Sequence, residues 1–121
     1  MAQVRYIVDD VESAVAFYTG RLGFSLVQQF GAAMAILEQD GLRLWVAGPT
    51  ASASRPMPDG ALPSPGGWNR IVLTVDNLEA LVARLRDEGV TFRNAIIEGP
   101  GGRQILCEDP AGNVVELFQP Q

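Results

Sequence analysis

The chain has 121 residues, a net charge of −5, one cysteine and no histidine; 47% of it is hydrophobic and 19% charged. This size fits one domain or two half-domains that share a core, with the composition of a soluble protein. The acidic charge argues against a nucleic-acid partner, and the lack of histidine removes the commonest transition-metal ligand and the usual general base. With no apolar run long enough for a membrane and no visible signal peptide, we expect a cytoplasmic protein. The lone Cys107 follows Ile and Leu, which favours a buried, unreactive thiol over a nucleophile.

The first 47 residues predict a strand, a helix and three strands. Asp9 and Glu12 stand three residues apart before an apolar helical periodicity, a capping-box pattern with Asp9 as the cap, and Gly23 is the expected helix end. The Asp40-Gly41 pair predicts a tight hairpin turn. The predicted strands are residues 3–8, 24–30, 33–38 and 42–47.

Residues 48–67 form a different kind of segment. It holds five of the eight prolines, with Ser, Ala and Gly between them. It is too polar and proline-rich for a regular element, which predicts a long linker or surface loop. The alternative is a flap over a binding site.

The first pattern then returns in the second half. Asp76 and Glu79 repeat the predicted helix start, and Gly89 is the expected end. The predicted strands are residues 68–75, 91–98, 102–108 and 114–118. Residues 7–12 align with 74–79, and residues 41–45 align with 112–116, so the chain contains an internal repeat. One copy alone would expose an apolar sheet face, so we expect two copies to pair.

The most informative stretch is the turn and strand at residues 109–117. Asp-Pro and Ala-Gly-Asn form turns, and Val-Val-Glu-Leu-Phe has the composition of a strand. Alternation places Glu116 on the same face as Val114 and Phe118. The simple interpretation is an exposed charge on an edge strand; the alternative is a carboxylate placed in a site.

These motifs in order resemble the vicinal oxygen chelate superfamily, which includes glyoxalase I, extradiol dioxygenases, fosfomycin-resistance enzymes and bleomycin-resistance proteins. The motifs that carry the resemblance are Val8-Asp9-Asp10-Val11 with Ala16-Phe17-Tyr18 and Leu22-Gly23-Phe24, Val75-Asp76-Asn77-Leu78 with Gly89-Val90, and Asp109-Pro110-Ala111-Gly112-Asn113-Val114-Val115-Glu116-Leu117. The resemblance covers the whole chain. It implies an α+β fold of two βαβββ units whose curved mixed sheets wrap a cleft, and often a homodimer. The expected organisation is one domain over 1–121, with units at 1–47 and 68–121 joined by the 48–67 linker.

The resemblance also implies which side chains occupy the metal positions of the metal-dependent members. They are Gln3, Trp45, Arg70 and Glu116. Only Glu116 suits a metal, because Trp45 cannot ligate and Arg70 stays cationic. We therefore expect no metal and no cofactor.

In place of a metal, the same positions suggest an ion pair. If the alignment holds, Arg70 and Glu116 point into one cleft and form a fork with two parallel hydrogen bonds. Either the pair only neutralises itself, or one member remains available to a ligand. The other candidate ligand-binding residues are Gln3, Arg5, Arg43, Trp45, Trp68, Arg103 and Gln104. Arg103 and Gln104 point to opposite faces of one strand, and the sequence does not say which one reaches the cleft.

Three hypotheses follow. The first is a metal-free protein that binds a small planar polar or anionic molecule, as bleomycin-resistance proteins do by sequestration. The second is a metal-independent lyase or isomerase, with Glu116 as general base and Arg70 as electrostatic clamp. A neighbouring arginine favours the ionised carboxylate and weakens such a base, which makes the enzyme the second choice. The third is a structural or regulatory module whose own side chains fill the cleft.

Overall fold

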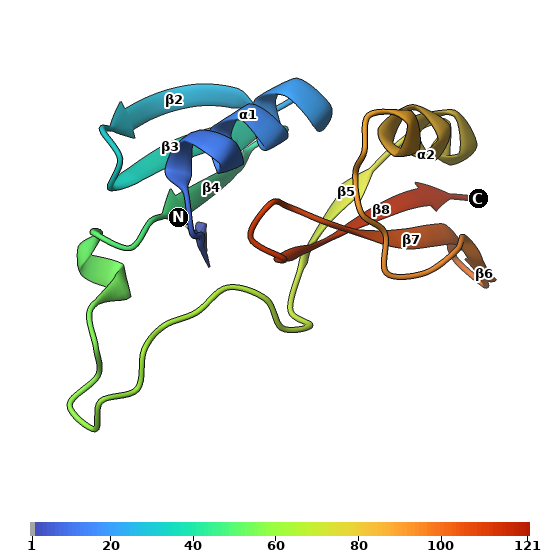
Figure 1. The fold of residues 1–121 in the computed structure, drawn as a ribbon. Coiled ribbons are helices and arrows are strands. Elements are labelled where there is room, and N and C mark those ends of the chain that lie inside the picture. The colour runs from blue at the N-terminus through green and yellow to red at the C-terminus, as the bar shows by residue number, and fades with distance from the viewer. Residues whose placement is uncertain (1) are drawn as a thin grey trace. The chain divides into compact units, whose positions relative to one another are not determined.

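The computed structural model describes residues 2–121, which divide after Gly66 into two compact units. Each unit contains one helix and one four-stranded sheet (Figure 1). The first unit comprises β1 (Val4–Ile7), α1 (Val11–Arg21), β2 (Ser25–Phe30), β3 (Met34–Gln39), β4 (Leu42–Ala47) and a 3-10 turn, η1 (Ser52–Ser54). The second comprises β5 (Ile71–Thr74), α2 (Leu78–Asp87), β6 (Ile97–Gly99), β7 (Gly102–Glu108) and β8 (Val114–Pro120).

The two sheets have the same topology. The strand order is β1-β4-β3-β2 in the first and β5-β8-β7-β6 in the second. In each, the first and last strands of the unit pair in parallel, and the remaining pairs are antiparallel. This identity of order and direction confirms the internal repeat and the predicted α+β fold of two βαβββ units.

Strand alternation gives the first sheet one buried face and one open face. Leu37, Leu44 and Val46 are fully buried, and α1, which packs on β3 and β4, buries Tyr18. The residues between them face the other way. We call that side the first open face; the register brings Arg5 beside Trp45 on it.

The second sheet is built in the same way. Ile105, Cys107, Val115 and Leu117 are fully buried, and α2 buries Val82. The register pairs the alternate residues Val72 with Glu116, Leu106 with Glu116 and Gln104 with Phe118. The side that carries these alternate residues is called the second open face.

Both helices begin one residue later than predicted. Asp10, with the extended φ of −144°, caps α1, and its side chain accepts a hydrogen bond from Glu12 N at 3.2 Å. Asn77 caps α2 by accepting from Ala80 N at 3.1 Å. In each motif two neighbouring residues could both cap a helix, and the second of them is the cap in the structure. The sequence alone does not decide between two adjacent Asp or Asn residues.

Three predicted segments differ in extent. Only Ile97 and Glu98 of the predicted strand 91–98 belong to β6; upstream, the Asn94 side chain accepts from Leu106 N at 3.0 Å, where a strand would supply a carbonyl. Strand β5 starts at Ile71 rather than at Trp68. Segment 48–67 contains the short η1, whose Ser54 hydroxyl donates to Gly48 O at 2.7 Å. Across residues 2–121, none of the helices has the length and apolar character needed to cross a membrane.

Candidate functional site

The first open face has a pocket at the start of β1. Gln3, Val4, Arg5 and Trp45 line a shallow, open cavity of about 240 Å³. The indole Nε1–H of Trp45 donates a hydrogen bond to Gln3 Oε1, and the Arg5 guanidinium carbon lies 4.8 Å from the centre of the Trp45 ring. The Gln3 amide orients the Trp45 ring, and the face of this ring contacts the Arg5 guanidinium. These three predicted residues therefore form one connected cluster.

Arg5 differs in electrostatics from the other arginines predicted for the site. Arg43, Arg70 and Arg103 each have a glutamate carboxylate within 4.0 Å. Arg5 forms no ion pair with any residue from 2 to 121; its contact is with the electron-rich face of Trp45. Its charge is therefore not neutralised by a carboxylate of the described chain.

The Arg70–Glu116 ion pair lies on the second unit. Glu116 is 8% exposed on β8, a central strand, so the interpretation as an exposed charge on an edge strand is wrong. Arg70 Nε and Nη2 each lie 3.0 Å from the same oxygen, Glu116 Oε1, and Arg70 Nη1 donates to Trp68 O at 3.3 Å. The expected fork onto both oxygens does not form. Within the described residues, Oε2 accepts no hydrogen bond.

The remaining predicted residues lie in several places. Gln104 lies on the second open face, in register with Phe118. Arg103 lies on the opposite side, toward α2, where it pairs with Glu79 and approaches Glu98 at 3.6 Å. On the first unit, Arg43 makes a long contact of 3.7 Å with Glu38. Trp68 precedes β5 and its side chain is largely exposed.

The donor set does not fit a divalent metal. The first unit offers an amide, already bonded to an indole N–H, and the second offers a carboxylate, already bonded to a guanidinium. In residues 2–121, no three His, Cys, Asp or Glu side chains gather as a metal-binding group. Structural and catalytic metal sites need three or four such ligands.

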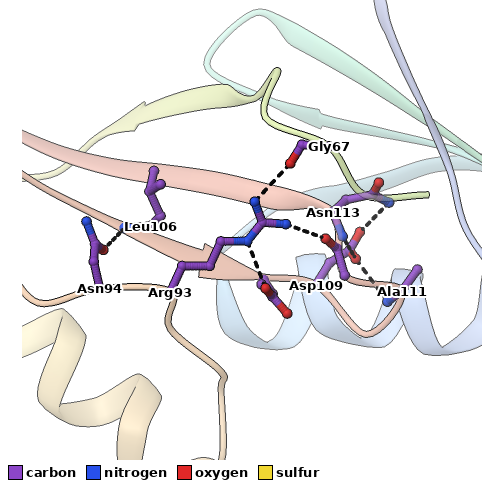
Figure 2. Close-up of polar contacts among 9 residues, drawn as sticks. Gly67, Arg93, Asn94, Leu106, Asp109, Ala111 and Asn113 are labelled. Carbon is purple, nitrogen blue, oxygen red and sulfur yellow. Dashed lines mark hydrogen bonds and ion pairs between the residues drawn. The ribbon is translucent and has the colours of Figure 1, made fainter.

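Arg93 is a polar residue that the sequence analysis missed. It lies in a loop and donates hydrogen bonds to three partners, Glu108, Gly67 and Gly112 (Figure 2). Its guanidinium also lies over the Trp68 ring. Arg93 falls inside the strand predicted at residues 91–98, where a lone arginine gives no sequence signal of such a role. Its partners are spread from residue 67 to 112, so only the folded chain reveals them.

The cysteine is buried, as expected from its apolar neighbours. Cys107 has no exposed surface, and burial, with a smaller contribution from Asp109 and Glu108, raises the pKa of its thiol from 9.0 to about 12. A thiol of this kind is a poor nucleophile, because the thiolate is the reactive form.

This raised pKa predicts a loss of stability in alkali. Above pH 9 the unfolded chain releases the thiol proton while the folded chain keeps it, so stability falls as the pH rises toward 12. Between pH 8 and 10 we expect Cys107 to account for a loss of about 1.4 kcal/mol in the free energy of unfolding. Urea unfolding of the wild type and of Cys107→Ala at both pH values measures it; equal pH dependence in the two proteins would refute the expectation.

Comparison with known proteins agrees with this architecture. The Glyoxalase/Bleomycin resistance protein/Dioxygenase superfamily model matches residues 1–117. A bleomycin resistance protein from Geobacillus stearothermophilus is 25% identical over 119 residues, which cover 93% of this chain and 90% of the relative.

Solved structures give the same result. TnmS3, an antibiotic binding protein from Streptomyces sp. CB03234, superimposes with a TM-score of 0.69 at 29% identity and covers 100% of this chain and 98% of its own. Lactoylglutathione lyase from Agrobacterium tumefaciens superimposes with a TM-score of 0.75 at 21% identity, covering 98% and 92%. At that identity the lyase shares the fold alone. Since the family model spans nearly the whole chain, this protein belongs to the Glyoxalase/Bleomycin resistance protein/Dioxygenase superfamily.

Proposed function

We propose that this protein binds and sequesters a small planar molecule carrying a polar or anionic group, without a divalent metal. The observation that carries the proposal is the pocket beside Trp45, where the positive charge of Arg5 has no ion-pair partner among residues 2–121. A guanidinium presents N–H donors in a plane and suits carboxylate or phosphate oxygens. A flat indole beside it suits a planar ring.

The order in this pocket favours binding. The hydrogen bond from Trp45 to Gln3 and the stacking of Arg5 on the indole hold the polar groups in place before a ligand arrives. A ligand then costs less conformational entropy, because fewer side chains are immobilised on binding. The net charge of the chain is −5, so the chain as a whole repels an anion. An anionic ligand therefore needs a local cation such as Arg5 to bind.

The second open face, taken by itself on its own unit, offers a different recognition group. Glu116 Oε2 has an unused acceptor position in the described chain, while the contact of Arg70 with Oε1 orients the carboxylate. An N–H or O–H donor on a ligand satisfies that oxygen. Gln104 on the same face and Trp68 before β5 are proposed as its further contacts.

Two relatives support sequestration over turnover. One is named a bleomycin resistance protein and the other an antibiotic binding protein, and each aligns with more than nine-tenths of this chain. Both descriptions concern resistance or binding rather than conversion. The homodimer implied by the family resemblance is part of the same proposal.

The experiment compares the affinities of matched ligands by calorimetry. The probes are planar aromatic carboxylates, such as 2-naphthoate, each with its neutral amide, titrated in the presence of EDTA. A charged hydrogen bond contributes about 1.5–3 kcal/mol, so we expect Arg5→Gln to weaken carboxylate binding about 10- to 100-fold and amide binding far less. The matched control is Arg55→Gln, which removes the same charge from an exposed position of the same unit.

Two results would overturn the proposal. One is that no carboxylate probe binds the wild type. The other is that Arg5→Gln and Arg55→Gln bind the carboxylates equally well.

The unused oxygen of Glu116 favours one alternative, a metal-independent lyase or isomerase in which this oxygen takes a proton from the substrate. Turnover of the bound probe class by the wild type, abolished in Glu116→Gln and kept in the exposed Glu98→Gln, would replace sequestration by catalysis.

A further inference from the structure

The second unit has a small polar pocket where β6 ends, β7 begins and β8 ends; these strands are labelled in Figure 1. The pocket has a volume of about 160 Å³, and Glu98, Arg103, Gln119 and Gln121 supply its polar side chains. Because one water occupies about 30 Å³ in the liquid, the pocket has room for about five waters or for one small organic group.

The sheet register places three of these side chains in one row. Glu98 of β6 pairs with Arg103 of β7, and Arg103 pairs with Gln119 of β8. Residues that pair directly across neighbouring strands have their side chains on the same face of the sheet. Gln119 Oε1 accepts a hydrogen bond from Leu78 N of α2 at 2.7 Å, so this face is turned toward α2. The row therefore lies on the side opposite to the second open face.

One hydrogen-bond donor in the row is buried and unused. Of the buried side-chain nitrogen and oxygen atoms in residues 2–121, Arg103 Nε alone has no hydrogen-bond partner. Glu98 Oε1 lies 3.6 Å from Nε, which is too far for a hydrogen bond, and Arg103 binds Glu79 through Nη2. A buried donor without an acceptor is unfavourable, so this nitrogen calls for a partner that the described chain does not supply.

Gln119 offers a second donor beside it. Its Oε1 accepts from Leu78 N, which fixes the orientation of the amide and leaves Nε2 as a donor. Among the residues that the structure describes, Nε2 donates to no acceptor. Since Gln119 and Arg103 are direct neighbours across β8 and β7, both donors can approach one oxygen atom in the pocket.

The charges around Arg103 favour a neutral acceptor. Glu79 and Glu98 both approach its guanidinium, so the three charged groups sum to −1 in a chain whose net charge is −5. A carboxylate is repelled by this surplus, and it competes with two glutamates for the same cation. The oxygen of an amide or a urea accepts hydrogen bonds without adding a negative charge.

We propose that this pocket is a second binding site, which takes the carbonyl oxygen of a small neutral amide or urea group. Arg103 Nε and Gln119 Nε2 donate to this oxygen. The inference goes beyond the proposed function, because the site uses other residues and takes an uncharged molecule instead of an anionic one.

The test titrates acetamide and acetate, which have nearly the same shape and differ in charge, against the ¹⁵N-labelled protein. Nitrogen–proton correlation spectra follow the Nε–H signal of Arg103 and the side-chain amide signals of Gln119. We expect acetamide to shift both with one dissociation constant on the order of millimolar, since a ligand of few atoms makes few contacts. At the Arg103 signal, acetate should bind about fivefold more weakly or worse.

Two variants separate this site from a general effect of arginine. Arg103→Lys keeps the positive charge but loses Nε–H and the planar fork of donors. We expect it to weaken acetamide binding, followed at Gln119, about 5- to 10-fold. The matched control is Arg84→Lys, whose guanidinium pairs with Glu88 on α2 at 3.1 Å outside the pocket; it should leave acetamide binding unchanged.

Three results would overturn the proposal. The first is that acetamide leaves the Arg103 and Gln119 signals of the wild type unshifted, which would mean that water alone satisfies Arg103 Nε. This result needs no variant, so it decides the question even where Arg103→Lys unfolds the unit. The second is that acetate binds at Arg103 as tightly as acetamide. The third is that Arg84→Lys and Arg103→Lys weaken acetamide binding equally. None of these titrations involves 2-naphthoate, so the proposed function is tested separately.

Discussion

Replacing Gly102 by alanine is expected to lower the free energy of unfolding by about 3–5 kcal/mol. Gly102 begins β7 with a φ of +150°, and a Cβ built there would lie 2.2 Å from Gln119 O and 2.9 Å from Pro120 Cα. Both are backbone atoms of β8, which pairs with Gly102 and cannot retreat without breaking the ladder. The cost combines overpacking with a backbone conformation that side chains rarely adopt.

A neighbouring glycine provides the control. Gly99 ends β6 in the same hairpin, and a Cβ there would meet no atom within 4 Å. We expect Gly99→Ala to change the stability by less than about 1 kcal/mol. Urea unfolding followed by circular dichroism measures both variants. A Gly102→Ala protein within 1 kcal/mol of the wild type would show that β7 and β8 do not approach as closely as described.

Asp109→Ala is expected to cost about 3 kcal/mol. Asp109 is 4% exposed, and its Oδ1 accepts from Ala111 N and Asn113 N, both at 2.9 Å (Figure 2). Its Oδ2 accepts from Asn113 Nδ2 at 3.1 Å, and Asn113 is itself 4% exposed. Alanine would leave the two buried donors of Asn113 and the part-buried Ala111 N–H without their acceptor, at about 1–3 kcal/mol for each buried group.

The matched control is another aspartate in a similar local turn. Asp59 Oδ1 accepts from Ala61 N at 3.0 Å, but the site is exposed, so water replaces the lost oxygen. We expect Asp59→Ala to cost less than about 1 kcal/mol by the same unfolding measurement. Equal losses in Asp59→Ala and Asp109→Ala would mean that burial does not determine the effect.

The fold was largely predictable, because its signals are local or repeated. The hydrophobic periodicities located both helices, and the repeat of residues 7–12 at 74–79 predicted two units of equal topology. Errors arose where side chains replaced backbone partners. Asn94 takes the place of a ladder carbonyl for Leu106, so the strand expected at 91–98 is interrupted between an isolated bridge of Phe92 with Cys107 and its last residues in β6.

The candidate site was predictable only in part. The family resemblance named Gln3 and Trp45, and strand alternation puts Arg5 on the same face as Gln3. Only the folded sheet shows that the parallel register brings Arg5 beside Trp45. The sequence alone did not decide whether Glu116 is buried or exposed. Its burial depends on whether its strand is central or at the edge, and the strand order is seen only in the folded sheet. Arg93 was missed because its partners lie up to 26 residues away in the chain and two are backbone carbonyls.

The central claim is that Arg5, which has no ion pair within the part of the chain that the structure describes, binds an anionic planar molecule without a metal. Native mass spectrometry tests it most directly, on protein purified without chelators, with and without 2-naphthoate, combined with metal analysis. We predict protein without a stoichiometric divalent ion that retains one naphthoate per pocket, and loss of this adduct in Arg5→Gln but not in Arg55→Gln. A stoichiometric divalent ion on which naphthoate binding depends, or an adduct that survives in Arg5→Gln, would contradict the claim.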